Sequence, residues 1–497
     1  MLLRLTIFTV SHIKPSLLMK NITLLSLLLL VFLSSCDDDL DDNLRPASST
    51  EISDFVYRGL NYWSLYKEDV PELANDFFEN DAARFDYLSQ FSSPEAAFDA
   101  LTSTRDRFSI LRDDYVALEN SLAGIRTSSG LNLSLLIMPN DPTTAFGVVR
   151  YVVNDSPADL AGAERGMIFT LVDGQPLTSG DGQAIDGSTN FNSFFAPDSY
   201  TIGLATYDGT DFTTTGEEII ITKTELTINP IHTVNVLSVG GNEIGYLHYT
   251  GFTNEFDSEL NAAFAQFRSA GVTDLVLDLR YNGGGSIETA NDLSTMITGQ
   301  FNGEEFITQE YNADRNQANE FVRRFNNNLG SGDDGPAINS LGLTRVFVLT
   351  TGRSASASEL ILSGLDPYIE VIQIGTNTVG KFEGSFLLYD APAPNFRRSE
   401  ANPNHRYVML PLVLKSVNAN GLTDYFDGFT PDLLIAEDFE NFGQLGEQGE
   451  PLLDAAIDII LNGRSSTNYN TRIQRSIYDS EQEDPLYQRM MVDRIDL

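Results

Sequence analysis

Residues 278–285 read Asp-Leu-Arg-Tyr-Asn-Gly-Gly-Gly and begin at the end of a short apolar run, residues 274–279. Consecutive glycines directly after a strand permit positive φ angles and a close approach of the backbone to a ligand. Their free N–H groups can hold an anion, which is either a phosphate group or the oxyanion of an acyl-transfer reaction. The Lys-Ser/Thr pair of a phosphate-binding P-loop does not follow these glycines. A tight turn without a ligand is the alternative for this stretch taken alone.

The glycine stretch belongs to a longer region, residues 226–465, in which short apolar runs alternate with helical patterns. Strands are predicted at 243–249, 274–279, 344–350 and 369–374, and helices at 256–270 and 286–296. Apolar runs of this length, separated by helices, are typical of strands that are buried on both faces of a sheet. The pattern therefore predicts an α/β core.

A second stretch, residues 354–360, reads Ser-Ala-Ser-Ala-Ser-Glu-Leu and follows the strand predicted to end at Thr350. Small residues at this point allow the N-terminus of a helix to lie against the sheet. The helix dipole and the free N–H groups there favour a developing oxyanion on a serine. An N-cap serine in a small-residue turn is the alternative.

A third stretch, residues 375–381, reads Gly-Thr-Asn-Thr-Val-Gly-Lys and again follows a predicted strand. Lys381 lies between Gly380 and Phe382, where partial burial would lower its pKa and make it a usable base near neutral pH. Only four lysines follow Cys36, so a lysine in a glycine-flanked loop stands out. An ordinary surface lysine is the alternative.

Together, the three stretches resemble the motifs of the carboxyl-terminal processing peptidases, also called tail-specific proteases. That family has a helical N-terminal region, a PDZ domain and a core that carries these motifs in this order, and the resemblance covers about residues 100–460. It implies that Ser356 is the nucleophile and that Lys381, 25 positions later, is the general base. It also implies that the backbone N–H groups of Gly284 and Ala357 form the oxyanion hole.

One position departs from the family pattern. Many members carry a glutamine four residues after the lysine, where it orients the lysine side chain. Here that position is Ser385, and Glu383 lies two residues before it. Either residue is a candidate replacement for the glutamine. The later stretch at 428–432, Gly-Phe-Thr-Pro-Asp, matches a further family motif.

Residues 126–225 contain short β-like runs that alternate with turns. The turns at 154–162 and 172–177 are similar to those of a PDZ domain, although Met167 replaces the usual aspartate at the start of the strand between them. PDZ domains commonly capture a chain end with loop N–H groups and a groove beside an exposed strand. The candidate peptide-binding residues are Gly130, Leu131, Asn132 and Leu133. Alternatively, this segment simply begins a strand and its leucines lie in the core.

The first 36 residues are predicted to be a signal peptide. Lys20 precedes an apolar run at 24–33, which is too short for a membrane-spanning helix. The run ends in Leu-Ser-Ser-Cys, which looks like a bacterial lipobox, with Cys36 as the lipidated residue. Translation starts at Met1 or at Met19. Residues 37–50 are an acidic tether that resembles a surface-export signal of Bacteroidetes lipoproteins.

The bulk composition limits the classes of function. The 497 residues are enough for about three domains. A formal charge of −39, from 31 basic and 70 acidic residues, would repel a phosphate backbone and argues against a nucleic-acid partner. The single cysteine excludes an intramolecular disulfide. Three histidines, His232, His248 and His405, show no metal-ligand spacing, and His248 is expected in the core or at a sheet edge.

The predicted organisation is a multidomain α+β protein. It has a helical N-terminal domain at 51–125, a PDZ-like domain at 126–225, a protease core at 226–465 and a polar tail at 466–497. The resemblance implies that the core is related to the crotonase and Clp-protease folds. The polar tail is inferred from composition alone.

The predicted function is that of a serine endopeptidase with a Ser/Lys dyad, which needs no cofactor and no metal. Its partners would be protein or peptide substrates, recognised at their C-termini, and a membrane reached through the lipid anchor. The predicted location is the bacterial cell envelope, as an outer-membrane lipoprotein that faces the periplasm or the cell surface. The alternatives are a catalytically silent PDZ scaffold and a crotonase-type acyl-thioester enzyme. The substrate and the oligomeric state stay open.

Overall fold

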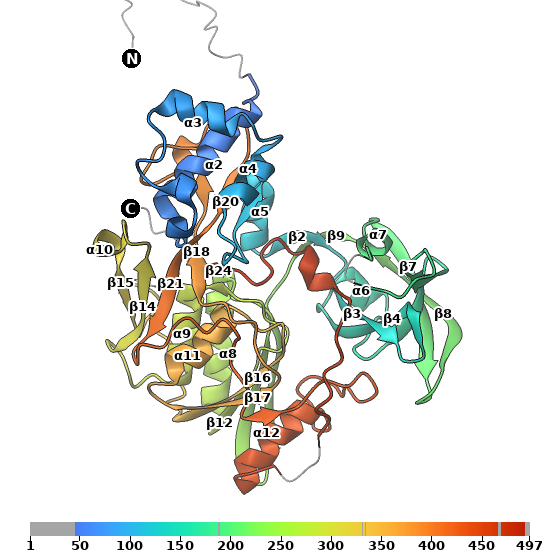
Figure 1. The fold of residues 1–497 in the computed structure, drawn as a ribbon. Coiled ribbons are helices and arrows are strands. Elements are labelled where there is room, and N and C mark those ends of the chain that lie inside the picture. Colours follow the sequence, from blue (N-terminus) through green and yellow to red (C-terminus); the bar gives the residue numbers. More distant parts are fainter. Residues whose placement is uncertain (1–44, 187–188, 331, 333, 466–468, 493–497) are drawn as a thin grey trace, which may run out of the picture. The chain divides into compact units, whose positions relative to one another are not determined.

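The computed structural model describes residues 45–186, 189–330, 332, 334–465 and 469–492 (Figure 1). The chain divides into a small unit, residues 1–47 with 403–405, and a large unit that contains all other residues. In the small unit, the N–H of Ala47 donates to the carbonyl oxygen of Asn404 at 3.2 Å. The predicted signal peptide and most of the acidic tether lie outside the described residues.

A six-stranded sheet forms the centre of the predicted core, and its strand order is β10-β11-β12-β16-β17-β22. The strands are β10 (Ile231–Val239), β11 (Asn242–Tyr249), β12 (Asp274–Asp278), β16 (Arg345–Thr350), β17 (Glu370–Gly375) and β22 (Leu433–Leu434). Only β10 and β11 pair in antiparallel fashion in this sheet, and the other neighbours are parallel. The four strands predicted for this region are confirmed.

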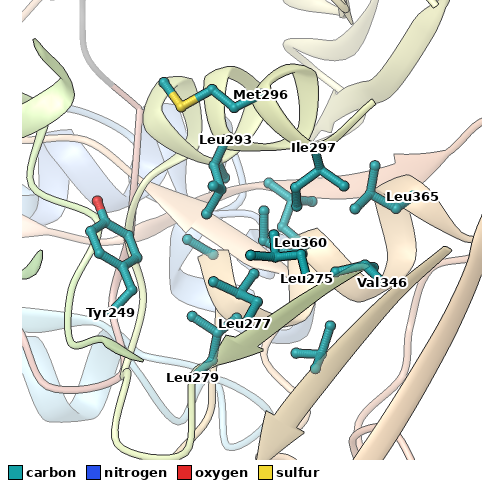
Figure 2. Packing of buried hydrophobic residues seen from close by; sticks show 14 of the residues in the cluster. Tyr249, Leu275, Leu277, Leu279, Leu293, Met296, Ile297, Val346, Leu360 and Leu365 are labelled. Atoms are coloured by element: carbon teal, nitrogen blue, oxygen red, sulfur yellow. The ribbon is translucent and has the colours of Figure 1, made fainter. Parts of the chain in front are cut away.

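Helices cover both faces of this sheet. Three helices pack on one face: α8 (Asp257–Ala270), α9 (Ile287–Ile297) and α11 (Ala357–Leu365). Figure 2 shows Leu293 of α9 and Leu360 of α11 beside Leu275 and Leu277 of β12. Successive side chains of a strand point to opposite faces. Val276 accordingly belongs to the other cluster, with α12 (Pro451–Asn462). Full burial of each such side chain contributes about 1.5–3 kcal/mol.

A second six-stranded sheet joins distant parts of the large unit. Its order is β13 (Gly285–Ser286), β24 (Met490–Met491), β18 (Glu383–Ser385), β21 (Leu412–Asn418), β14 (Glu305–Tyr311) and β15 (Phe321–Arg324). Strand β13 carries the last residue of the glycine stretch, and β18 begins two residues after Lys381. Two segments that are far apart in the sequence are therefore held in one sheet.

The N-terminal region is mainly helical, as predicted. Its helices are α2 (Ser49–Trp63), α3 (Asp81–Leu88), α4 (Pro94–Leu101) and α5 (Tyr115–Leu122). Ser93 is the N-cap of α4 and accepts a hydrogen bond from the N–H of Ala96, as its Ser-Pro-Glu start indicates. Phe55 and Trp63 of α2 share a hydrophobic cluster with Phe386 and Met409 of the predicted core. The helices are therefore packed onto the core by apolar burial.

Residues 126–222 contribute six strands to a seven-stranded sheet, which we call the β domain sheet. Its order is β23 (Tyr478–Asp479), β3 (Leu131–Met138), β4 (Asp141–Val152), β6 (Gln175–Thr178), β5 (Ile168–Val172), β7 (Ser199–Tyr207) and β8 (Phe212–Thr222). Positive φ angles of 50° at Asp173 and 70° at Gly174 form the tight turn between β5 and β6. A short helix, α6 (Pro157–Leu160), is capped by Ser156.

The remaining elements are short. They are β1 (Ile110–Arg112), β2 (Ile125–Ser128), α7 (Asn192–Phe195), β9 (Thr224–Thr227), α10 (Asn316–Asn319), β19 (Leu388–Tyr389), β20 (Val408–Leu410) and the 3₁₀ turns η2 (Lys67–Asp69), η3 (Pro71–Leu73), η4 (Asn254–Phe256), η5 (Arg398–Glu400) and η6 (Ser480–Glu483). Among the described residues, no helix has both the length and the apolar content to span a bilayer.

The structure corrects the prediction that residues 466–497 form a polar tail. Residues 469–492, which we call the return segment, contribute β23 to the β domain sheet and β24 to the second six-stranded sheet. Tyr478 and Met490 are buried among core residues. The composition misled because the buried apolar residues are few and separated, while Asp479, Glu481 and Asp484 of the segment are paired with arginines.

Candidate active site

Ser356 lies in the tight turn between β16 and the first residue of α11. Its φ of 65° and ψ of −118° are unusual for a residue with a side chain, and such strain persists only where the surrounding structure holds it. The hydroxyls of Ser354 and Ser358 donate to main-chain carbonyl oxygens at 2.8 and 2.9 Å. The buried Oγ of Ser356 has no hydrogen-bond partner in the part of the chain that the structure describes. Of the three serines, Ser356 alone carries an unpaired hydroxyl.

Gly284 packs directly against this serine. Its φ is 113°, and a Cβ at this position would lie 2.6 Å from the Cβ and 2.7 Å from the Oγ of Ser356. Only glycine fits such an approach. The N–H of Gly284 donates to the side-chain oxygen of Asn282 at 2.8 Å. The structure therefore brings Gly284, Ala357 and Ser356 together, with the N–H of Gly284 turned toward Asn282.

Lys381 is fully buried, as is Ser356. Burial lowers the pKa of Lys381 to about 8, although the charge of Glu383 opposes this shift and Arg489 adds to it. The ammonium nitrogen donates to the main-chain carbonyl oxygen of Glu383 and lies 4.9 Å from the ring centre of Phe108. A lysine with this pKa is partly neutral near pH 7 and can accept a proton.

Glu359 connects the main chain of Ser356 to that of Lys381. Its buried carboxylate accepts hydrogen bonds from the N–H groups of Ser356 and Lys381, both at 2.8 Å. It also accepts from the N–H of Gly380 at 2.7 Å and the hydroxyl of Thr378 at 2.6 Å. Burial raises the pKa of Glu359, and these four bonds act in the opposite direction. Sequence reasoning assigned no role to Glu359, although a glutamate three residues after a helix-starting serine is a capping-box signal.

The structure also describes the two candidate replacements for the lysine-orienting glutamine. The hydroxyl of Ser385 is buried and has no hydrogen-bond partner among the described residues. The side chain of Glu383 accepts from the hydroxyl of Tyr66 at 2.6 Å. Lys381 is held by the main-chain oxygen of Glu383, not by either side chain. Tyr66 and Phe108 come from the N-terminal region, where the sequence showed no chemistry.

A cavity of about 720 Å³ opens beside the glycine stretch. Its lining includes Phe252, Gly284, Tyr389, Arg489 and Met491. Glycine main chain and aromatic rings thus border a space beside Gly284. Its lining suits a peptide, because the apolar walls can take side chains while the glycines approach the backbone.

The predicted peptide-binding residues lie at the start of β3. The N–H groups of Gly130 and Leu131 donate to the hydroxyls of Ser128 and Ser129 at 3.1 and 3.2 Å. The side chains of Leu131 and Leu133 are packed in the core of the β domain, and both residues also line a pocket of about 160 Å³ beside β3. The oxygen of the Asn132 side chain accepts from Arg150 at 2.7 Å. For the leucines, the structure supports the interpretation that this segment begins a strand.

His248 is a core residue, as expected. It is fully buried in β11, and its ring lies 4.8 Å from that of His232. Burial lowers the pKa of His248 well below its usual value. Among the described residues, no group of histidine, cysteine and carboxylate side chains is arranged to hold a metal ion.

Known protein families match two regions of the chain. Residues 243–388 match the profile of Peptidase family S41, and residues 51–110 match that of the Peptidase S41 N-terminal domain. The first region contains Gly284, Ser356, Glu359 and Lys381. Residues 243–388 are therefore similar to an S41 peptidase domain. The candidate residues therefore lie in a region that is similar to S41 peptidases, as the resemblance implied.

Individual relatives of the S41 domain support this assignment. The chain is 24% identical over 252 residues to carboxyl-terminal-processing peptidase 3, chloroplastic, of Arabidopsis thaliana, a match that covers 50% of this chain and 44% of the relative. It is 33% identical over 143 residues to a carboxy-terminal-processing protease of Bartonella bacilliformis, which covers 28% of this chain and 29% of the relative. The chain therefore spans less than half the length of these two curated relatives.

A solved structure shares the fold. It is a protein of Bacteroides fragilis that is described as an S41 protease, with 24% sequence identity and a TM-score of 0.64. The similarity covers 83% of this chain and 98% of that one. The expected multidomain α+β architecture is thus confirmed as an S41 protease fold.

Proposed function

We propose that this protein is a serine endopeptidase of the carboxyl-terminal processing type, with Ser356 as nucleophile and Lys381 as general base. One observation carries the proposal: Glu359 holds the main chain of an unpaired, strained serine and of a lysine with a pKa of about 8. A serine needs an adjacent base to become a nucleophile at neutral pH. A buried neutral lysine supplies that base without a histidine.

The proposed reaction is acyl transfer. Neutral Lys381 takes the proton of the Ser356 hydroxyl as the oxygen attacks a peptide carbonyl carbon. The N–H groups of Ala357 and Gly284 stabilise the oxyanion, and for this the N–H of Gly284 leaves Asn282 when the substrate binds. Protonated Lys381 then gives its proton to the leaving amine. A water molecule hydrolyses the acyl-enzyme by the same route, and Ser356 regains its proton.

The substrates would be proteins or peptides, and the β domain would be a PDZ-like module that binds them. Support comes from the short helix α6 after Ser156 and from the tight turn between β5 and β6, which match the turns of the PDZ resemblance. Peptides add to exposed sheet edges through main-chain hydrogen bonds in this class of domain. Recognition of substrate C-termini belongs to the same proposal.

The proposed location is the bacterial cell envelope, as an outer-membrane lipoprotein that faces the periplasm or the cell surface. Support comes from the lipobox-like residues 33–36 and from the acidic tether after Cys36. Cys36 lies outside the described residues. The lipid on Cys36 would provide the attachment to the membrane.

A serine-directed fluorophosphonate tests the proposed chemistry. We expect the purified protein to be labelled at Ser356, and Ser356→Ala to lose both the label and peptide cleavage. The Ser354→Ala and Ser358→Ala variants are matched controls that remove hydroxyls bonded to the main chain, and they should keep measurable labelling. A folded protein that takes no label would instead support the silent PDZ scaffold.

A further inference from the structure

The outer edge of β3 is occupied by the chain itself. In the β domain sheet, Tyr478 and Asp479 of β23 pair in antiparallel register with Leu135 and Ser134. The N–H of Ile477 donates to the carbonyl oxygen of Leu135, and the N–H of Leu133 donates to the hydroxyl of Ser480, both at 2.9 Å. An edge strand with free N–H and C=O groups is where an extended peptide adds to a sheet. Here the return segment takes that place.

Two arginines fix the register of this added strand. One oxygen of Asp479 accepts from Arg150 at 2.7 Å and from Arg353 at 2.6 Å. Glu481 lies beside Arg150, at 3.2 Å. Burial alone would raise the pKa of Asp479, but Arg150 and Arg353 hold this pKa well below its usual range, so the carboxylate stays charged.

Arg150 and Arg353 come from separate parts of the fold. Arg150 belongs to β4 and is only 1% exposed, whereas Arg353 lies three residues before the nucleophile. A buried guanidinium group without an anionic partner is costly. The arginines therefore form a site that requires a carboxylate, and this site includes a residue of the nucleophile loop.

The return segment continues from this site to the nucleophile. A Cβ at Gly284 would lie 2.8 Å from the carbonyl oxygen of Arg489, about as far as from the Oγ of Ser356. The N–H of Val492 donates to the carbonyl oxygen of Ser385 at 2.9 Å. One continuous segment thus covers the edge of β3 and lies against the glycine that faces the nucleophile. A peptide substrate cannot occupy either place while the segment is bound there.

We infer that the edge of β3, Arg150 and Arg353 form a docking site for an extended, acidic segment of a polypeptide, and that the return segment is its internal competitor. The inference deepens the proposed function, because it names an acidic anchor as the feature that selects the substrate. The recognised chemistry is main-chain pairing to β3 plus a carboxylate between the two guanidinium groups.

Binding of a free peptide tests this without any turnover. The probe is a fluorescent peptide with the sequence of residues 474–485, and a second probe carries amides in place of the side-chain carboxylates that match Asp479 and Glu481. All proteins carry Ser356→Ala. We expect Asp479→Asn to loosen the return segment and to bind the acidic probe at least tenfold more tightly than its parent. The amide probe should bind at least tenfold more weakly than the acidic one.

Matched controls separate this effect from a general change of charge. Asp366→Asn removes one exposed acidic side chain and should leave probe binding as in the parent. Adding Arg353→Gln to Asp479→Asn should abolish the tighter binding of the acidic probe. Equal binding of both probes by Asp479→Asn, or no gain over the parent, would overturn the inference.

A reversible disulfide provides a second test, which is needed if Asp479→Asn fails to fold. Ser134→Cys and Asp479→Cys place thiols on two directly paired residues, in a chain that also carries Cys36→Ser. Oxidation should lock the return segment and block the probe, and reduction should restore binding in the same molecules. Equal binding in both states would overturn the inference. Because binding is measured in Ser356→Ala proteins, probe binding there combined with no fluorophosphonate labelling of the wild-type protein refutes only the proposed protease activity.

Discussion

The carboxylate of Glu359 accepts a hydrogen bond from the backbone N–H of Lys381 at 2.8 Å. The same carboxylate accepts the N–H of Ser356, so one buried acid positions two segments that are 25 residues apart in the sequence. It bonds the main chain of both residues and leaves the Ser356 hydroxyl and the Lys381 amine free for other contacts. Glu359 is therefore a positioning residue.

Replacement of this acid should disturb both stability and pH dependence. In Glu359→Gln, one of the two acceptor oxygens becomes an NH₂ group that faces backbone donors. We expect a loss of about 1–3 kcal/mol of unfolding free energy and a fall in the labelling rate of at least tenfold. The charge of Glu359 raises the pKa of Lys381, so its removal should move the rising limb of the rate profile to lower pH. Labelling rates between pH 6 and pH 10 measure this shift.

Glu450→Gln is the matched control for Glu359→Gln. Glu450 is also buried and also caps a helix, because it accepts the N–H of Leu453 at 2.8 Å, but it is paired with Arg280. Its replacement should lower stability and leave the midpoint of the pH profile in place. An unchanged midpoint in Glu359→Gln as well would show that Glu359 has only a structural role.

The pH dependence of the wild-type protein follows from Lys381 itself. Only neutral lysine can take the proton of Ser356, and burial lowers its pKa to about 8. The labelling rate should therefore rise about tenfold per pH unit below that value and level off above it. Lys381→Arg should be inactive, because arginine stays protonated. A rate that is independent of pH between 6 and 9 would contradict the role of Lys381.

The positions of the three candidate segments could be predicted because each of them follows a short apolar strand. Parallel strands end at one edge of their sheet, so loops after β12, β16 and β17 converge there. The glycine stretch, Ser356 and Lys381 are therefore readable from local patterns. The helix-capping role of Glu359 could also be predicted from a capping-box pattern. The local pattern does not show that its carboxylate also accepts a hydrogen bond from Lys381.

Contacts between distant segments could not be predicted in this way. Tyr66 reaches Glu383 and Phe108 lies beside Lys381 across more than half of the chain, and neither carries a local motif. The return segment reads as polar, because burial of its carboxylates depends on arginines from β4 and from the nucleophile loop. A tertiary ion pair of this kind leaves no periodic signal in the sequence.

Ser385 is predicted to be dispensable for catalysis, although the family resemblance implies a lysine-orienting glutamine at this position. Its hydroxyl has no hydrogen-bond partner in the described residues, and Lys381 is held by the carbonyl oxygen of Glu383. Ser385→Ala should therefore keep the labelling rate within about threefold, because removing a hydroxyl that makes no bond costs little. A tenfold fall with an unchanged melting temperature would instead show that Ser385 orients the lysine in the reacting state.

Membrane attachment is predicted to depend on Cys36. In cells, Cys36→Ser should shift the protein from the membrane fraction to the soluble fraction or should leave the precursor unprocessed. A single acyl chain binds membranes only marginally, whereas several chains anchor a protein firmly. Mass spectrometry of the N-terminal peptide from the membrane fraction measures the modification. An unmodified Cys36 in the mature protein would refute the anchor.

The close contact between Gly284 and Ser356 gives the sharpest structural prediction. In Gly284→Ala the new methyl group would lie 2.6 Å from the Cβ of Ser356 and 2.8 Å from the carbonyl oxygen of Arg489. The backbone would also keep a φ of 113°, which residues other than glycine rarely adopt. Both effects push the glycine stretch away from the nucleophile, so labelling should fall at least a hundredfold while circular dichroism shows a folded protein.

Gly303→Ala is the control for Gly284→Ala. It introduces backbone strain without a clash against Ser356. Gly303 also has a positive φ, 86°, but a Cβ there meets no atom within 4 Å. Its replacement should cost about 1 kcal/mol of stability through strain and leave labelling near that of the wild-type protein. If Gly284→Ala labels as fast as Gly303→Ala, the glycine stretch does not face the reacting serine in the active state, and the oxyanion hole must be sought elsewhere.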